Sequence, residues 1–132
     1  MLFQIDPRSP VPIWEQIVNQ IKELVLKGIL LPGDKIFSVR ELASNLVINP
    51  NTVSKAYQEL ERQGIIETFR GRGTFIRQNV NIIKDEEKIK HLQEKIKQLV
   101  IEGTYLGIKT ETLIQWIQDI EQELGRDIHD PS

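Results

Sequence analysis

The side chains best suited to binding chemistry in this chain of 132 residues gather in two short segments. They are Asn49, Asn51, Thr52, Ser54 and Lys55 in the first segment, and Arg70, Gly71, Arg72 and Gly73 in the second. An Asn side chain can pair bidentately with adenine, and the Thr methyl group can contact the methyl group of thymine. An Arg on a glycine-rich turn can enter a narrow minor groove. The two segments therefore predict contacts with double-stranded DNA.

The sequence offers little for catalytic or metal-binding chemistry. The chain has no cysteine, and its two histidines, His91 and His129, lie far apart. The segment Gly71–Gly73 lacks the Lys-Ser/Thr pair of a phosphate-binding loop. We therefore predict that the protein is not an enzyme and that it has no catalytic residues, no metal site and no cofactor.

An amphipathic helix should open the chain. Pro12 suits the first helical position, where its missing N–H would have no partner. Apolar side chains then recur at three- and four-residue spacing, namely Ile13, Ile17, Ile21, Leu24 and Val25. Gly28 permits the left-handed backbone that ends a helix. The segment Leu31–Asp34, with its Pro-Gly pair, is typical of a turn.

Two shorter helices should follow. Ser38 and Glu41 have the spacing of a capping box, which predicts a helix starting at Ser38. Asn49 precedes Pro50, and a residue before proline favours the extended geometry of an N-cap. This predicts a third helix from Pro50 to about Gln63. Two helices joined by a short turn form a helix-turn-helix, whose second helix enters the major groove with its N-terminal residues.

A β-hairpin should complete this region. The segments Ile65–Arg70 and Thr74–Arg77 are β-prone runs on either side of Gly71–Gly73. A hairpin directly after a helix-turn-helix makes the motif a winged one. The predicted fold is therefore mainly α (α+β), with three helices plus a β-hairpin wing, followed by a two-helix C-terminal tail.

Several residues of the predicted DNA surface also have a purely structural explanation. Ser38 and Asn49 cap helices whether or not they touch DNA. Arg40, near the start of the second helix, can reach the DNA backbone or a guanine edge. Arg72 and Lys55 could each be ordinary solvent-exposed residues. The DNA interpretation rests on all of them sharing one surface, and Ser38 and Arg40 complete the predicted contact set.

The rest of the chain predicts a helical tail. One helix should run from Asp85 to near Gly103, and a last helix should begin beyond Gly107. We expect their apolar residues to form a dimer seam, namely Ile89, Leu92, Ile96, Leu99, Leu113, Ile117 and Ile120. The alternative is that this stripe packs on the winged helix of its own chain. The predicted division is a DNA-binding domain at 1–77, a linker at 78–84 and a dimerisation tail at 85–132.

The overall charge is compatible with this interpretation but does not support it. The net charge is −2, whereas basic side chains outnumber acidic ones between Lys35 and Arg77. Local field matters for phosphate binding more than net charge does. The chain has neither a basic, apolar leader nor a run of the ~20 apolar residues that cross a membrane. We therefore expect a cytoplasmic protein with no membrane association.

Residues 11–77 resemble the DNA-binding domain of the GntR family of bacterial transcription regulators. The matching segments are Pro12–Ile17, Leu31–Lys35, Ser38–Ala43, Asn49–Val53, Ala56–Glu61 and Gly71–Phe75. The tail is similar to that of the short-tailed YtrA-like branch, where it serves dimerisation. The resemblance implies that Arg40, Asn49–Lys55 and Arg70–Gly73 contact operator DNA. It also implies a small-molecule effector, as yet unidentified, and control of a transporter operon. We predict a repressor that binds a palindromic operator as a homodimer.

The chain departs from the family pattern at two positions. Val47 stands where the family usually has Gly, so we expect either a strained left-handed Val47 or a remodelled turn. Phe37 replaces a common Pro and could bury against the first helix. A cleft lined by Trp14, Tyr105 and Trp116 is a weaker alternative to core packing. The rival function is a winged helix that binds only proteins, which would not need phosphate and base donors at these positions.

Overall fold

The computed structural model describes residues 3–78 and 85–125. The chain divides into two compact units, residues 1–81 and residues 82–132, called here the N-terminal and C-terminal units. Each unit is described by itself. Apart from Gln78, the linker predicted at 78–84 lies outside the described residues, so the predicted division into domains stays a prediction.

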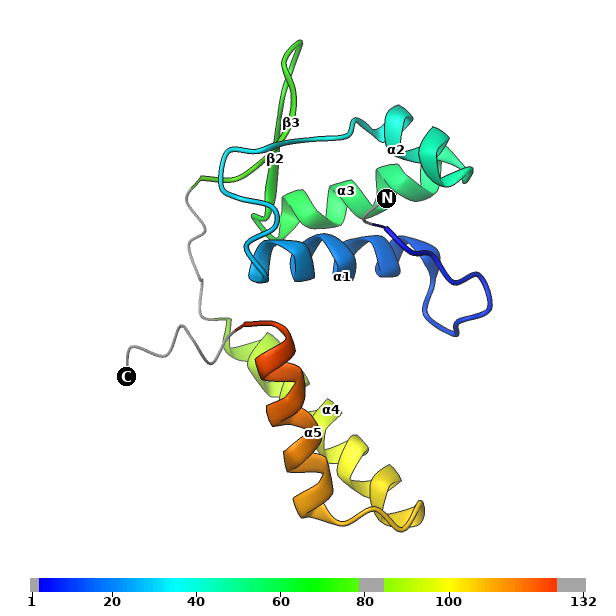
Figure 1. Ribbon diagram of the computed structural model, residues 1–132, viewed down its shortest axis with the longest axis vertical. Coiled ribbons are helices and arrows are strands. Elements are labelled where there is room, and N and C mark those ends of the chain that lie inside the picture. The colour runs from blue at the N-terminus through cyan, green and yellow to red at the C-terminus, as the bar shows by residue number, and fades with distance from the viewer. Residues whose placement is uncertain (1–2, 79–84, 126–132) are drawn as a thin grey trace. The chain divides into compact units, whose positions relative to one another are not determined.

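The described residues of the N-terminal unit form three helices (Figure 1). They are α1 (Ile13–Leu26), α2 (Val39–Leu46) and α3 (Pro50–Arg62), and α3 packs against both of the others. The largest fully buried side chains of the core are Ile17, Ile21, Leu42, Val53, Leu60, Ile66 and Ile76. The predicted helices are confirmed with small shifts at their ends. Pro12, for example, is the N-cap of α1 and not its first helical residue.

A small antiparallel sheet with the strand order β1-β3-β2 covers part of this core. Strands β2 (Ile66–Phe69) and β3 (Gly73–Ile76) form the predicted hairpin, with Ile66 opposite Ile76. Strand β1 (Lys35–Ile36) was not predicted, because two residues carry no readable alternation. It is held in place by backbone hydrogen bonds from Gly33 N to Ile76 O and from Ile76 N to Asp34 O, each 2.8 Å long.

The turn between α2 and α3 keeps a left-handed residue although that residue is valine. Val47 has φ 56° and ψ 52°, and it is the sole non-glycine residue with positive φ in the described part of the chain. Its N–H donates to Ser44 O, and the N–H of Ile48 donates to Ala43 O. These two bonds are those of a Schellman motif. Of the two outcomes expected at Val47, the structure shows the left-handed one.

The C-terminal unit consists of α4 (Glu86–Tyr105) and α5 (Thr110–Glu123) within its described residues. The predicted end of α4 near Gly103 is confirmed with a small shift, since the helix ends at Tyr105. Gly103 is buried inside the helix, where a Cβ would lie 3.2 Å from Leu113 Cδ1. The glycine therefore allows α5 to approach α4 closely. Gly107, with φ +76°, permits the turn that follows the helix.

The two units together confirm the predicted fold class. The N-terminal unit is a winged helix-turn-helix, and two helices follow it, so the protein is mainly α. Among the described residues of the C-terminal unit, Gly103 is the only buried one, so no apolar side chain is buried there.

Candidate nucleic-acid interface

The first turn of α3 presents polar side chains around its N-cap. Asn49 Oδ1 accepts a hydrogen bond from Asn51 N at 2.8 Å, so the capping role of Asn49 is confirmed. Asn49, Asn51 and Lys55 are exposed, whereas Thr52 and Ser54 are partly buried. Pro50 at the first helical position has no N–H, Asn51 N donates to Asn49 Oδ1, and Thr52 N donates to Asn49 O at 3.0 Å, so the first turn has no unpaired backbone donor. The groups at this end of α3 that can contact bases or phosphate are therefore the exposed side chains of Asn49, Asn51 and Lys55.

A capping box fixes the start of α2. Ser38 Oγ accepts from Glu41 N at 3.1 Å, and Glu41 Oε1 accepts from Ser38 N at 2.9 Å. The hydrogen bond from the Ser38 backbone lowers the pKa of the Glu41 carboxyl group, and the Ser38 side chain lowers it further. Arg40 is exposed on the same turn. Its backbone position is thus defined by local hydrogen bonds, while its side chain stays free to reach a ligand.

The tip of the wing is a tight turn that requires glycine. Arg72 N donates to Phe69 O at 2.9 Å, and Gly71 has φ +80° at the third position of the turn, as a type II turn requires. A Cβ on Gly71 would meet no atom within 4 Å. Gly71 is therefore needed for its backbone conformation and not for packing within the chain. Arg70 and Arg72 are both exposed beside it.

A depression of about 550 Å³ joins the wing to α2 and α3. The predicted contact residues that line it are Ser38, Ser54, Arg70, Gly71, Arg72 and Gly73. Arg40, Asn49, Asn51, Thr52 and Lys55 are not among its lining residues. Thr68 also lines the depression, and its Oγ1 lies 3.2 Å from Glu61 Oε1 and 3.3 Å from Thr74 Oγ1.

Two residues of this region escaped the sequence analysis as contact candidates. Gln58 lines the depression and is exposed, one helical turn after Ser54. The spacing of four residues from Ser54 was a signal that could have found it. The second is Trp14 of α1. The ammonium group of Lys55 lies over the Trp14 ring, with Lys55 Nζ 4.7 Å from the ring centroid. No local pattern connects these two residues, since they lie on different helices.

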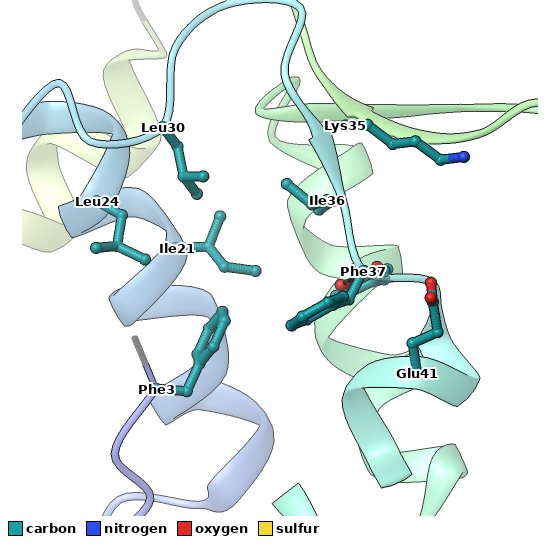
Figure 2. A pocket seen from close by; sticks show the side chains of 9 residues that line it. Phe3, Ile21, Leu24, Leu30, Lys35, Ile36, Phe37 and Glu41 are labelled. Carbon is teal, nitrogen blue, oxygen red and sulfur yellow. Dashed lines mark hydrogen bonds between the residues drawn. The ribbon is translucent and has the colours of Figure 1, made fainter. Parts of the chain in front are cut away.

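Phe37 lies on an apolar pocket of about 440 Å³ in the N-terminal unit. Figure 2 shows Phe3, Ile21, Leu24, Leu30, Ile36 and Phe37 around it. Phe37 is still 45% exposed, so the expected burial against α1 is only partial. Tyr57 Oη donates to Phe37 O at 2.6 Å, and burial raises the pKa of Tyr57. The pocket is thus linked through Phe37 to the N-cap of α2.

The predicted dimer seam is largely exposed in the single chain. Ile89, Leu92, Ile96, Leu99, Ile117 and Ile120 have exposed fractions between 39% and 62%. Leu113 differs because it packs on Gly103 of its own chain. Further apolar side chains that are exposed on these helices are Val100, Ile101, Tyr105, Leu106, Ile114 and Trp116. Trp14 lies in the N-terminal unit, whereas Tyr105 and Trp116 lie in the C-terminal unit, so the alternative of a cleft lined by all three stays untested.

Other kinds of site were sought in the described residues. No group of three or more His, Cys, Asp or Glu side chains there could hold a metal ion. His91 is exposed, and His129 lies outside the described residues. None of the described helices is both long and apolar enough to span a membrane.

Similarity to known proteins extends along nearly the whole chain. Residues 13–76 match the family described as "Bacterial regulatory proteins, gntR family". The HTH-type transcriptional repressor YtrA of Bacillus subtilis (strain 168) is 55% identical over 93% of this chain and 95% of its own length. A crystal structure described as a transcriptional antiterminator from Listeria monocytogenes EGD-e is 44% identical, with a TM-score of 0.86 over 94% of this chain and 92% of that chain. YtrA from Sulfolobus acidocaldarius, a GntR-family transcription factor, is 33% identical, with a TM-score of 0.55 over 93% of this chain and 99% of that chain.

Proposed function

The chain belongs to the gntR family of bacterial regulatory proteins, and from this premise we propose that it represses transcription by binding a palindromic operator as a homodimer. It is a DNA-binding transcription regulator by family. The proposal adds that the protein represses transcription, that a two-fold symmetric dimer binds the operator, and which residues contact the DNA. It assigns a binding role and no catalytic one, and it places the protein in the cytoplasm, where the DNA is.

The observation that carries the DNA contact is the shared surface of α3, the start of α2 and the wing. The depression beside the wing gathers Ser38, Ser54 and Arg70–Gly73 from three elements. The N-terminus of α3 adds the exposed side-chain amides of Asn49 and Asn51 and the partial positive charge of a helix start. In the proposal, Asn49–Lys55 and Arg40 meet the major groove and the adjacent backbone, and the wing arginines meet the minor groove.

The homodimer is supported by the exposed apolar side chains of the C-terminal unit. A helical pair with no buried apolar side chain among its described residues has too little core to be stable alone. A second copy can cover the stripe of Leu92, Ile96 and Leu99 on α4, because a two-fold interface brings the same patch from both chains together. The two recognition helices would then read half-sites ~34 Å apart, about one helical turn of DNA.

Salt titration with duplex DNA tests the proposal. The affinity for a duplex that carries the operator should fall by orders of magnitude as salt rises, because several condensed counterions are released. Footprinting upstream of the protein's own operon should reveal two symmetric protected half-sites. Affinity that hardly changes with salt would indicate a protein-binding winged helix. Binding to single-stranded RNA in preference to duplex DNA would contradict operator binding and favour antitermination.

Modulation by a small molecule stays a prediction from the family. The apolar pocket at Phe37 has a volume that lies within the range of ligand sites, which is ~300 to 1,000 Å³. Its link to the α2 N-cap through Phe37 would couple occupancy to the DNA surface.

A further inference from the structure

The contact between Trp14 and Lys55 joins α1 to the proposed DNA surface. Lys55 Nζ lies 4.7 Å from the centroid of the Trp14 ring, which is within the range of a cation–π interaction. Trp14 is the second residue of α1 and is partly buried, whereas Lys55 is exposed on α3. The ring therefore restricts the orientation of a lysine whose ammonium group still faces solvent.

The indole N–H of Trp14 is a second available donor. It forms no hydrogen bond within the described part of the chain, and no buried side-chain nitrogen or oxygen there lacks a partner. The indole N–H must therefore reach solvent. An indole N–H can only donate, so it is suited to an acceptor such as a phosphate oxygen.

We propose that Trp14 and Lys55 together contact the DNA backbone, so that the first turn of α1 belongs to the operator interface. The Trp14 ring orients the Lys55 ammonium group, and the indole N–H donates to a phosphate oxygen. This inference rests on the proposed operator binding. Because phosphate contacts carry no sequence information directly, the pair should contribute equally to operator and non-operator duplexes.

The alternative is that the contact only packs α1 against α3. A packing role predicts that loss of the ring lowers thermal stability but leaves the DNA affinity of the folded protein unchanged. A phosphate contact predicts a loss of DNA affinity when the N–H alone is removed, and a further loss on removal of the ring that requires Lys55 to be present. A double-mutant cycle separates these two outcomes.

The experiment measures the affinity of the full chain for operator and scrambled duplexes over a range of salt concentrations. Lys55→Gln should weaken binding to both duplexes by about fivefold and reduce the salt slope by about one. Lys55→Arg should retain the slope. Trp14→Phe keeps a ring but removes the N–H, and it should weaken binding by about three- to fivefold. Trp14→Leu removes the ring as well, and it should weaken binding further than Trp14→Phe does in the wild-type chain but no further in the Lys55→Gln background, where no ammonium group is left to orient.

Lys27→Gln is the matched control, because Lys27 lies at the opposite end of α1 and pairs with Glu23. The fold-changes in DNA affinity caused by Lys27→Gln and by Trp14→Phe should multiply in the double variant, as they do for independent sites. The inference is overturned if Trp14→Leu weakens binding further than Trp14→Phe in the Lys55→Gln background as well, or if Trp14→Phe shifts only the melting temperature. A wild-type chain that binds no duplex would instead overturn the proposed function, and this inference with it.

Discussion

Val47 holds a backbone conformation that costs an L-residue roughly 1–2 kcal/mol and is worse for a β-branched one. Its side chain is 87% exposed, so burial returns little of that cost. The conformation persists because the hydrogen bonds of Val47 and Ile48 to the end of α2 require it. A single residue thus stores strain in the turn that precedes the recognition helix.

Val47→Gly should therefore stabilise the protein. Part of the relief is offset by the greater freedom of Gly in the unfolded chain, so we expect a gain of about 1 kcal/mol in the free energy of unfolding. Denaturant unfolding measures it. Gly28→Val is the opposite exchange, at a position with φ +72° and no atom within 4 Å of a built Cβ. It should cost about 1–2 kcal/mol. If both exchanges changed the free energy of unfolding in the same direction, the strain argument would be wrong.

Arg40 is the residue on which the base-reading part of the proposal is most directly tested. Arg40→Ala should reduce operator affinity by about 1–3 kcal/mol, because the side chain is exposed and no other basic group replaces it on α2. Fluorescence anisotropy with labelled operator DNA measures the change. Lys27→Ala removes the same charge away from the surface and should change the affinity little. An unchanged affinity for Arg40→Ala would exclude its assigned role.

The C-terminal ends of four helices share one local hydrogen-bond pattern. Three helices end at a glycine followed by isoleucine, and in each the isoleucine N–H donates to the carbonyl five residues earlier. The donor residues are Ile29 after α1, Ile65 after α3 and Ile108 after α4. Ile48 after α2 makes the same bond behind Val47. One local motif therefore terminates helices in both units, and it tolerates a valine where glycine is usual.

The capping box of α2 should make stability depend on pH in the acid range. Hydrogen bonds from Ser38 lower the folded-state pKa of Glu41 below its ordinary value of 4.5. A lowered folded-state pKa contributes stability that is present above the unfolded pKa and lost as the pH falls through the folded pKa. Stability relative to Glu41→Gln, which can still accept from the Ser38 N–H, should therefore shrink as the pH falls from about 6 to about 3. Denaturant unfolding at each pH measures the difference.

Ser38→Ala is the companion variant. It should lower stability by about 1 kcal/mol at neutral pH through the lost N-cap, and it should also weaken the pH dependence attributed to Glu41. Because Ser38→Ala keeps the backbone N–H, which lowers the pKa of Glu41 the most, the weakening should be only partial. A pH dependence that survives Glu41→Gln unchanged would show that another carboxyl group is responsible.

At the scale of the whole molecule, the exposed apolar stripe of the C-terminal unit demands a partner surface. Replacing Leu92 and Ile96 with Glu in the same chain should give monomers, because charges would be buried in the seam. The affinity for the operator should fall when the dimer is lost, because a monomer can contact only one half-site. Sedimentation velocity reports the state of assembly.

Gln98→Glu with Lys90→Gln is the matched control for this variant. It changes the net charge of α4 by the same amount at exposed positions that lie about 100° or more around the helix from the predicted seam residues of α4. This control should remain dimeric. An intact dimer after the Leu92 and Ile96 exchanges would dismiss the seam.

The amino-acid sequence by itself determined where the helices of the N-terminal unit begin and end. Ser38 with Glu41, Asn49 with Pro50 and the glycine after α3 act within a few residues, so their hydrogen bonds can be inferred from neighbouring positions. The hairpin followed from the β-prone runs on either side of Gly71–Gly73, and the fold class followed from the order of these elements.

The tertiary structure alone decided the features that depend on distant partners. Strand β1 exists because β3 supplies its hydrogen bonds, and Gly103 lies inside α4 because Leu113 packs on it. The contact of Trp14 with Lys55 likewise requires α1 and α3 to pack together. Local hydrogen bonds are encoded by adjacent residues, whereas these contacts depend on which surfaces the folded chain brings together.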